Sequence, residues 1–223
     1  NYDVISESEV AYTGYSIKNQ KYLFDLQNAG GDTFKLDLNI PSEVIIEGKN
    51  YSVTVIGGNE FTNVYVRSVV IPKSVTRIEE RAFVRYTKLE SVDIPNSVTR
   101  IGFKAFAGCA KLENIVIPNS VTHIGSKAFE GCVALRSLVI PASVTSIGAG
   151  VFSNCKYLET ITFENPEPPY SCSQDAEYSS SDIPLPPPPI NEPNLTHVFS
   201  GSNVKTVYVP AGAVDTYKKY FSL

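Results

Sequence analysis

The sequence repeats itself every 23 residues over residues 66–163, and this period limits the fold more than any other feature. Isoleucine-proline pairs begin at Ile71, Ile94, Ile117 and Ile140. The same interval separates Ile78, Ile101, Ile124 and Ile147; Phe83, Phe106, Phe129 and Phe152; and Cys109, Cys132 and Cys155. Self-similarity at a period of about 20–50 residues is typical of stacked-repeat proteins. We therefore predict a solenoid.

Each repeat begins with a pattern that predicts a short β-strand. In one copy the apolar residues Val92 and Ile94 alternate with Ser91 and Asp93, which is the two-residue period of a strand with one buried face. Pro95 then ends the strand, because proline has no N–H to donate to a ladder.

A second extended run follows at residues 98–101 and ends at Gly102. Ala105, Phe106 and Cys109 then have the spacing of one face of about two helical turns. The apolar positions of a single coil cannot close a core, but stacked coils make continuous columns of buried side chains. We expect the repeat strands to form one parallel sheet.

The consensus L-x-x-V-x-I-P-N-S-V-T-x-I-G-x-x-A-F-x-G-C resembles the BspA-like leucine-rich repeats of bacterial surface proteins, which are common in Bacteroides. Residues 39–57 resemble the opening coil of that family, and residues 208–217 resemble its closing segment. The resemblance implies a leucine-rich-repeat solenoid, a right-handed α/β superhelix with a parallel sheet. It also implies a role in adhesion and protein binding, while the ligand is left open.

The sequence predicts a cap and a solenoid that form one structural unit. Residues 1–33 carry no repeat, and two alternating runs around Gly30 and Gly31 predict a β-hairpin that covers the open end of the stack, so residues 1–39 are predicted to be an N-terminal β cap. The rest of the chain is predicted to be the solenoid. Its parts are the regular coils at 66–163, a proline-rich insert at 165–195, and a terminal coil and cap at 196–223, within a solenoid of residues 40–223.

Two segments depart from the period. The interval from Ile40 to Ile71 is eight residues longer than one repeat, which predicts an added excursion near residues 46–51. The insert holds nine prolines, and its run of four favours polyproline II, so we expect it to loop out, either as a solvated loop or as a partner's docking site. The period resumes at Phe199, and residues 214–221 predict a short capping helix.

Overall composition excludes some function classes. A net charge of −4 and a pI near 5.3 argue against a nucleic-acid binder. No run reaches the roughly 18 apolar residues of a membrane helix. Because the chain contains no methionine and no signal peptide, we expect that an export signal has been removed and that the protein lies at the cell surface or outside the cell.

Three of the four cysteines share one repeat position. Cys109, Cys132 and Cys155 would form a column about 5 Å apart, the spacing of neighbouring strands. We expect them to be buried and reduced. One adjacent disulfide or a metal is the alternative, although no ligand spacing of a metal motif is present. Cys172, in the insert, is the thiol we expect reagents to reach.

Candidates for catalysis are few. The chain has only two histidines, His123 and His197, and His123 occupies a variable position held by Arg77, Arg100 and Ser146 in other repeats. This position is predicted to point outward. No nucleophile elbow, phosphate loop or zinc-protease motif occurs. We predict that the protein is not an enzyme and binds no cofactor or metal.

The outward side chains of the strands form a first candidate binding surface. Alternation predicts two outward columns, Ser68, Ser91, Asn114, Ser137, Thr160 and Thr206 in one, and Val70, Asp93, Val116, Val139, Thr162 and Tyr208 in the other. Small hydroxyl groups beside exposed valines suit a flat surface for protein or glycan. A simple preference of strands for β-branched residues explains the pattern equally well.

Basic residues form the leading candidate for a binding site, and the outward strand surface is its alternative. Residues 67–111 hold nine basic and four acidic side chains. The 23-residue spacing aligns two basic columns, Arg77, Arg100 and His123 in one, and Arg81, Lys104 and Lys127 in the other. Because aligned like charges repel, we hypothesise a stripe that faces an acidic protein or a sialylated or sulfated glycan. The alternative is a solvated face interleaved with Glu79 and Glu80.

Two partner classes follow for a binding module. A protein partner, from a host or from a bacterial surface, is the first. A role as a glycan-binding accessory protein of a bacterial surface polysaccharide system is the alternative. Glycan sites are usually rich in exposed aromatic rings, and this chain has no tryptophan while its 13 tyrosines lie mostly in the caps and insert. The composition therefore favours protein.

Overall fold

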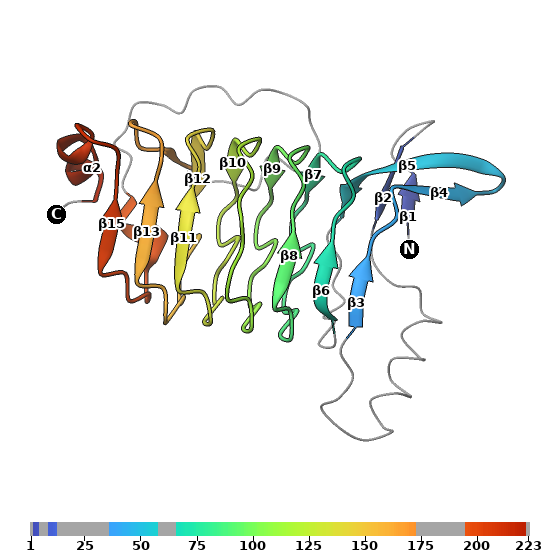
Figure 1. Cartoon of the computed structure of the whole chain (residues 1–223), viewed down its shortest axis with the longest axis horizontal. Coiled ribbons are helices and arrows are strands. Elements are labelled where there is room, and N and C mark those ends of the chain that lie inside the picture. Colours follow the sequence, from blue (N-terminus) through green and yellow to red (C-terminus); the bar gives the residue numbers. More distant parts are fainter. Residues whose placement is uncertain (1, 5–8, 13–35, 58–65, 173–194, 222–223) are drawn as a thin grey trace, which may run out of the picture.

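The computed structural model describes residues 2–4, 9–12, 36–57, 66–172 and 195–221. Within these ranges the chain winds into a stack of coils, and Figure 1 shows the strands of successive coils side by side along the long axis. The predicted solenoid is therefore confirmed.

One side of the stack, which we call the strand face, carries two parallel three-stranded sheets. They comprise β3 (Leu36–Asn39), β6 (Val66–Val70) and β8 (Ser91–Asp93), and β11 (Ser137–Ile140), β13 (Thr160–Phe163) and β15 (Thr206–Tyr208). The register pairs residues 23 apart, such as Ser68 with Ser91. β3 lies inside the predicted N-terminal cap, yet it pairs with β6 of the solenoid.

The prediction of one continuous sheet is wrong. Residues 114–117 lie between the two sheets without regular strand pairing, although Ile115 and Ile117 are buried as the pattern predicts. Two local features explain the interruption. Asn114 replaces the serine or threonine of the other repeats, and asparagine is depleted in strands. Glu113 also lies one repeat from Glu90, and like charges opposite each other destabilise pairing.

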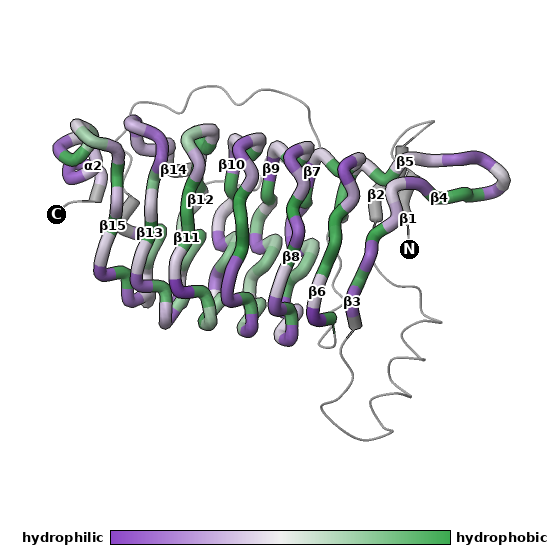
Figure 2. The backbone as a smooth tube through the Cα atoms, in the orientation of Figure 1, coloured by the Kyte–Doolittle hydropathy of each residue, from purple (hydrophilic) through white to green (hydrophobic). Residues whose placement is uncertain are grey.

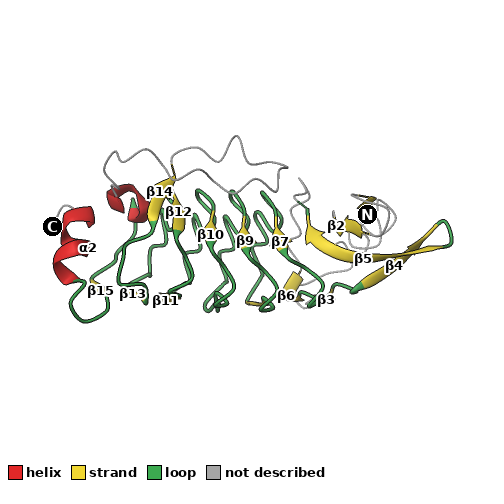
Figure 3. Cartoon of the chain, turned by 90° about the horizontal axis from the view of Figure 1, so that it is seen from above, coloured by secondary structure: helices red, strands yellow, loops and turns green. Residues whose placement is uncertain are grey.

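The opposite side of the stack carries a nine-stranded sheet (Figure 3). Its members are β1 (Tyr2–Val4), β2 (Glu9–Tyr12), β4 (Glu43–Ile46), β5 (Lys49–Ile56), β7 (Arg77–Ile78), β9 (Arg100–Ile101), β10 (His123–Ile124), β12 (Ser146–Gly148) and β14 (Tyr170–Cys172). From β5 to β14 the neighbours are parallel. The second extended run of each repeat is therefore a strand, as predicted.

The helical turns predicted after each second strand are absent from the regular coils, and that prediction is wrong. The N–H of Ala107 bonds to the carbonyl of Lys104 at 3.1 Å, but the N–H of Phe106 bonds to Ala128 of the next coil at 2.8 Å. Lys104 and Gly108 also adopt positive φ values of 53° and 76°. Alternate N–H groups leave for the neighbouring coil, so no helical ladder can form.

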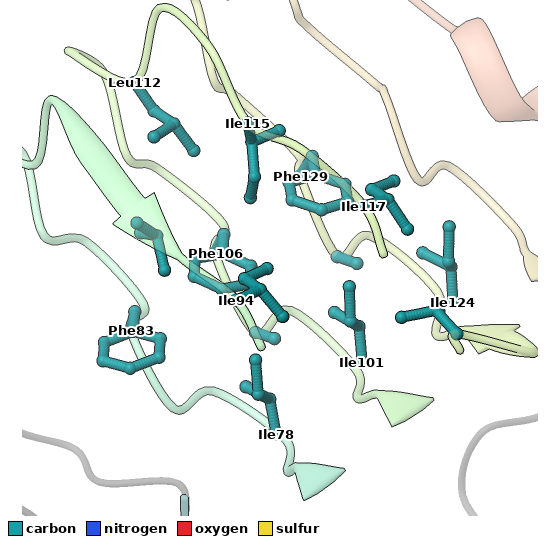
Figure 4. Packing of buried hydrophobic residues seen from close by; sticks show 14 of the residues in the cluster. Ile78, Phe83, Ile94, Ile101, Phe106, Leu112, Ile115, Ile117, Ile124 and Phe129 are labelled. Carbon is teal, nitrogen blue, oxygen red and sulfur yellow. The ribbon is translucent and has the colours of Figure 1, made fainter. Parts of the chain in front are cut away.

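Phenylalanine rings run through the core as a continuous stack. The ring centroids of Phe83, Phe106, Phe129, Phe152 and Phe199 follow one another at 5.2, 5.5, 5.8 and 5.9 Å, with interplanar angles of 15° or less. Isoleucine and leucine columns lie beside the stack and point inward with it (Figure 4). Along the tube of Figure 2, apolar and polar segments alternate where strands turn one side to this core.

Hydroxyl groups join the backbones of successive coils, which the sequence analysis did not predict. Ser97 donates to the carbonyl of Val75 at 2.6 Å, and Thr99 donates to the carbonyl of Thr76 at 3.2 Å. The other repeats make the same bonds. The Ser-Val-Thr part of the consensus therefore satisfies backbone acceptors around the buried valine.

The excursion predicted near residues 46–51 is a β-hairpin of β4 and β5. Glu47 and Gly48 form its turn with φ values of 51° and 79°, the backbone that a two-residue hairpin loop needs. The hairpin projects from the N-terminal end of the stack (Figure 1). Most of the hairpin predicted for the N-terminal cap, between residues 16 and 38, lies outside the described residues.

The C-terminal cap is confirmed as a helix, α2 (Val214–Phe221). Tyr217 is buried, its ring centroid lies 5.3 Å from that of Phe163, and its hydroxyl donates to the carbonyl of Asn165 at 2.8 Å. Burial raises the pKa of this phenol. The helix therefore covers the last coil of the core.

The proline-rich insert was predicted to leave the sheets from residue 165 onward, and this is wrong for its first part. β14 pairs in parallel with β12, with Tyr170 opposite Ser146. No proline lies within β14, so its N–H groups can join the ladder. Residues 173–194, which contain the four consecutive prolines, lie outside the described residues. The 3₁₀ helix η1 (Leu195–Phe199) then returns the chain to the phenylalanine stack.

Candidate functional site

The three cysteines of the repeat are buried free thiols, as predicted. The Sγ atoms of Cys109, Cys132 and Cys155 donate to the carbonyls of Phe83, Phe106 and Phe129 at 3.2, 3.2 and 3.1 Å. Burial raises the pKa of the Cys109 and Cys155 thiols to about 12 and raises that of Cys132 as well. These groups are core side chains and not nucleophiles.

We therefore expect thiol reagents to modify none of these three cysteines in native protein at pH 8. The thiolate is the reactive form, and a pKa near 12 leaves almost none of it at that pH. The measurement is thiol titration of a Cys172→Ser variant, with and without denaturant. Reagent uptake should appear only on unfolding, and fast reaction of native protein would contradict the burial of the column.

Among the residues that the structure describes, no metal site is formed. No three His, Cys, Asp or Glu side chains among them lie close enough to hold a metal ion. Within the same residues, no helix has the length and apolar character needed to cross a membrane.

The predicted outward orientation of His123 is wrong, because only 6% of the residue is exposed. On either side of it in the sheet lie Arg100 and Ser146, one strand away.

The structure aligns the first predicted basic column. Arg77 lies opposite Arg100, and Arg100 lies opposite His123, in neighbouring parallel strands. The Nε of Arg77 donates to Glu79 at 3.1 Å, within a salt bridge that is partly buried. This column therefore has a carboxylate at its first member and a buried imidazole at its third.

The second basic column, Arg81, Lys104 and Lys127, is more exposed but is also interleaved with acids. Arg81 lies 3.9 Å from Glu80, and both lysines lie 3.9 Å from Glu130. These distances exceed a hydrogen bond, so the pairs are loose and solvent-screened. Glu130 was not part of the predicted pattern, and it reduces the net charge of the stripe.

Exposed apolar side chains stand out on the strand face. The exposed fraction is 78% for Val116, 48% for Val139 and 58% for Tyr208, and Val70 of the same column is exposed too. Asp93 of the same column is exposed, and so are Ser91, Asn114 and Ser137 of the neighbouring column, as predicted. The face thus combines a column of valines and Tyr208, interrupted by Asp93 and Thr162, with a column of small polar groups.

Ion pairs border the two ends of the strand face. Arg67 donates to Asp37 at 3.0 Å, and Lys205 donates to Glu159 at 2.7 Å. The hydrogen bond from Arg67 lowers the pKa of the Asp37 carboxyl, and that from Lys205 lowers the pKa of Glu159. These charges are already paired within the chain, whereas the exposed Asp93 carries a charge in the same column as Val116.

The repeat, the parallel strands and the buried columns define a leucine-rich-repeat solenoid. A sequence model of the BspA type leucine rich repeat region matches residues 15–169 in six copies. The chain belongs to this BspA type leucine-rich-repeat family.

Several solved structures are similar to the chain. A leucine-rich repeat protein from Bacteroides ovatus is 31% identical, with a TM-score of 0.59, over 74% of this chain and 42% of that one. A leucine rich cell surface protein from Faecalibacterium prausnitzii is 30% identical, with a TM-score of 0.58, over 76% of this chain and 44% of that one. The chain thus spans less than half the length of either relative.

A leucine rich repeat protein from T. pallidum shares the fold. It is 20% identical, with a TM-score of 0.61, over 99% of this chain and 92% of that one. No curated protein matches the chain. The fold and the family are thus shown, while the ligand must be inferred from the surface.

Proposed function

We propose that the protein is a non-enzymatic binding module, displayed at the cell surface or secreted, whose strand face binds another protein. The exposure of Val116, Val139 and Tyr208 on one flat face carries this proposal. Large apolar side chains that remain exposed together on a solenoid mark a surface for a partner. The solenoid needs none of them for its own core, which the inward residues already fill.

The chemistry of the face favours a protein surface as its partner. The fully buried centre of a protein interface is apolar and rich in aromatic residues such as Tyr208, and polar groups form its rim. The serine, threonine and asparagine column beside the valines supplies such hydrogen-bonding groups. The partner we infer is a host or bacterial surface protein, in keeping with the relative named as a cell surface protein.

Binding of a neutral glycan at the same face is the second candidate. Tyr208 and Tyr157 are exposed, and the Arg136 guanidinium lies 5.9 Å from the Tyr157 ring centroid. Tyrosine rings can stack on sugars, which supports a role as a glycan-binding accessory protein. Valines at Val116 and Val139 contribute nothing comparable to sugar recognition, so we rank this function second.

A pair of matched variants tests the proposal. Val116→Asp with Val139→Asp places two charges in the centre of the strand face and should abolish capture of a protein partner from host matrix or bacterial lysates. The control is Ile45→Asp with Val214→Asp, which alters side chains of nearly equal exposure, 76% and 47%, outside the strand face. Equal capture by both variants, or binding only on a glycan array, would contradict the proposal.

A further inference from the structure

Close to the nine-stranded sheet, two basic side chains lie near one aromatic ring, that of Phe103. Phe103 occupies a repeat position that holds Glu80, Ser126 and Ala149 in the other coils. Its ring is half-buried, and the Arg81 guanidinium and the Lys104 ammonium lie 5.9 and 5.3 Å from its centroid. Both distances fall within the range of a cation–π contact. The repeat pattern does not predict a role for Phe103, because no other residue in its column is aromatic.

The three residues of the second basic column have positive φ values, a backbone conformation that residues with a Cβ atom rarely adopt. Arg81, Lys104 and Lys127 have φ values of 56°, 53° and 58°. The equivalent residue of the next coil is Gly150, which has the same conformation without a side chain to strain it. Three residues with Cβ atoms thus stand where the fold prefers glycine.

A neighbouring column shows that the chain uses tolerant residues elsewhere. Four residues later in each turn, the positive-φ position holds Arg85, Gly108, Gly131, Asn154 and Gly201. Glycine and asparagine dominate that column, as conformational preference predicts. Backbone strain kept at specific positions is a mark of a functional constraint. The positive φ values of Arg81, Lys104 and Lys127 thus point to this column as a place where function outweighs backbone preference.

We propose that Phe103, Arg81, Lys104 and Lys127 form a binding site for an anionic polysaccharide, separate from the strand face. These residues follow directly after β7, β9 and β10, which lie on the other side of the stack (Figure 3). The proposal goes beyond the protein-binding function and does not depend on it.

The geometry matches a repeating, negatively charged sugar chain. Successive coils place the backbones that carry the three cations about 4.8 Å apart, the spacing of neighbouring strands, so the charges repeat along the stack as they do along a charged polysaccharide. Their ion pairs with Glu80 and Glu130 are 3.9 Å long, so the donors can turn to a carboxylate or sulfate group. Phe103 offers an apolar ring between two cations, on which the C–H face of a sugar can stack. An acidic peptide would use the charges but would leave this ring without a role.

The test uses the full chain and four defined probes. Binding is measured to polygalacturonate, which carries carboxylates, to dextran sulfate, to neutral dextran, and to polyglutamate, an acidic polypeptide. The variant Arg81→Gly with Lys104→Gly and Lys127→Gly removes three charges and relieves the strained backbone, so its thermal midpoint should stay close to that of the wild type. The control is Lys111→Gln with Lys218→Gln and Lys219→Gln, which removes three exposed charges elsewhere.

We expect the glycine variant to weaken binding to a charged polysaccharide by about tenfold or more, and the control to weaken it far less. Phe103→Ser, which copies the residue of the next repeat, should weaken the same binding with all charges in place. Neutral dextran should not bind. Absence of binding to both charged polymers, an equal loss in the control, or equal binding of polyglutamate would overturn the proposal. Capture of a protein through the strand face would survive each of those outcomes.

Discussion

Replacement of Phe129 with alanine is expected to lower the free energy of unfolding by about 3–5 kcal/mol, the range for a large aromatic side chain removed from a core. Phe129 is fully buried, and it stacks on Phe106 and Phe152 at 5.5 and 5.8 Å. The cavity would therefore break the ring stack in the middle. Because each coil is stabilised by its neighbours, we expect the whole array to be destabilised together.

Chemical denaturation followed by circular dichroism measures this loss. Tyr157→Ala serves as the control, because it removes an aromatic ring that is more than half exposed. The control should change stability by about 0.5 kcal/mol or less, as is usual at surface positions. A loss below about 1 kcal/mol for Phe129→Ala would show that the phenylalanine column does not hold the coils together.

Gly125→Ala is expected to destabilise the protein by about 3 kcal/mol, at the upper end of overpacking effects. A Cβ at Gly125 would lie 2.6 Å from the carbonyl carbon of Gly102 and 2.6 Å from the nitrogen of Phe103. Both atoms are backbone, so no side chain can rotate away. The glycine of the consensus therefore permits the close approach of successive coils.

Gly48→Ala provides the comparison for this effect. Gly48 has a φ of 79°, but an added Cβ there would meet no atom within 4 Å. The backbone strain alone should destabilise by about 1 kcal/mol. Equal losses for the two variants in thermal unfolding would mean that coil contact does not explain the glycine at position 125.

The repeat period predicts the architecture well because the spacing of apolar residues directly identifies the buried columns. The inward isoleucines, leucines and phenylalanines, the short parallel strands and the α2 cap all follow from apolar spacing. The conformation of the turn after each second strand does not follow from apolar spacing. Phe106 and Cys109 are three residues apart, which fits a chain of tight turns as well as a helix. The positive φ at Lys104 cannot be read from a lysine, which normally avoids it.

The structural effects of local departures from the consensus were harder to predict from the sequence. Asn114 interrupts the sheet, and the ladder partner of β12 is a short strand inside a proline-rich segment. Both depend on contacts between coils that a single repeat does not contain. His123 shares its repeat position with Arg77 and Arg100, which predicts an outward side chain. In the folded chain it is buried in the sheet, between Arg100 and Ser146.

The candidate surfaces were predicted only in part. Strand alternation correctly places Val116 and Val139 outward, because a period of two leaves no other choice. Alignment of the basic columns is also confirmed, but their role as a site stays a proposal. Glu130 and Phe103, which change the chemistry around Lys104, come from different repeats and meet only in the folded chain.

Hydroxyl-radical footprinting of the captured complex shows whether the strand face is the protein-binding surface. This method reports the solvent exposure of individual side chains by mass spectrometry. We expect oxidation of Val116, Val139 and Tyr208 to fall when the partner binds, while oxidation of Ile45 on the β4–β5 hairpin does not change. Unchanged oxidation of these three residues, with protection elsewhere on the solenoid, would contradict this expectation.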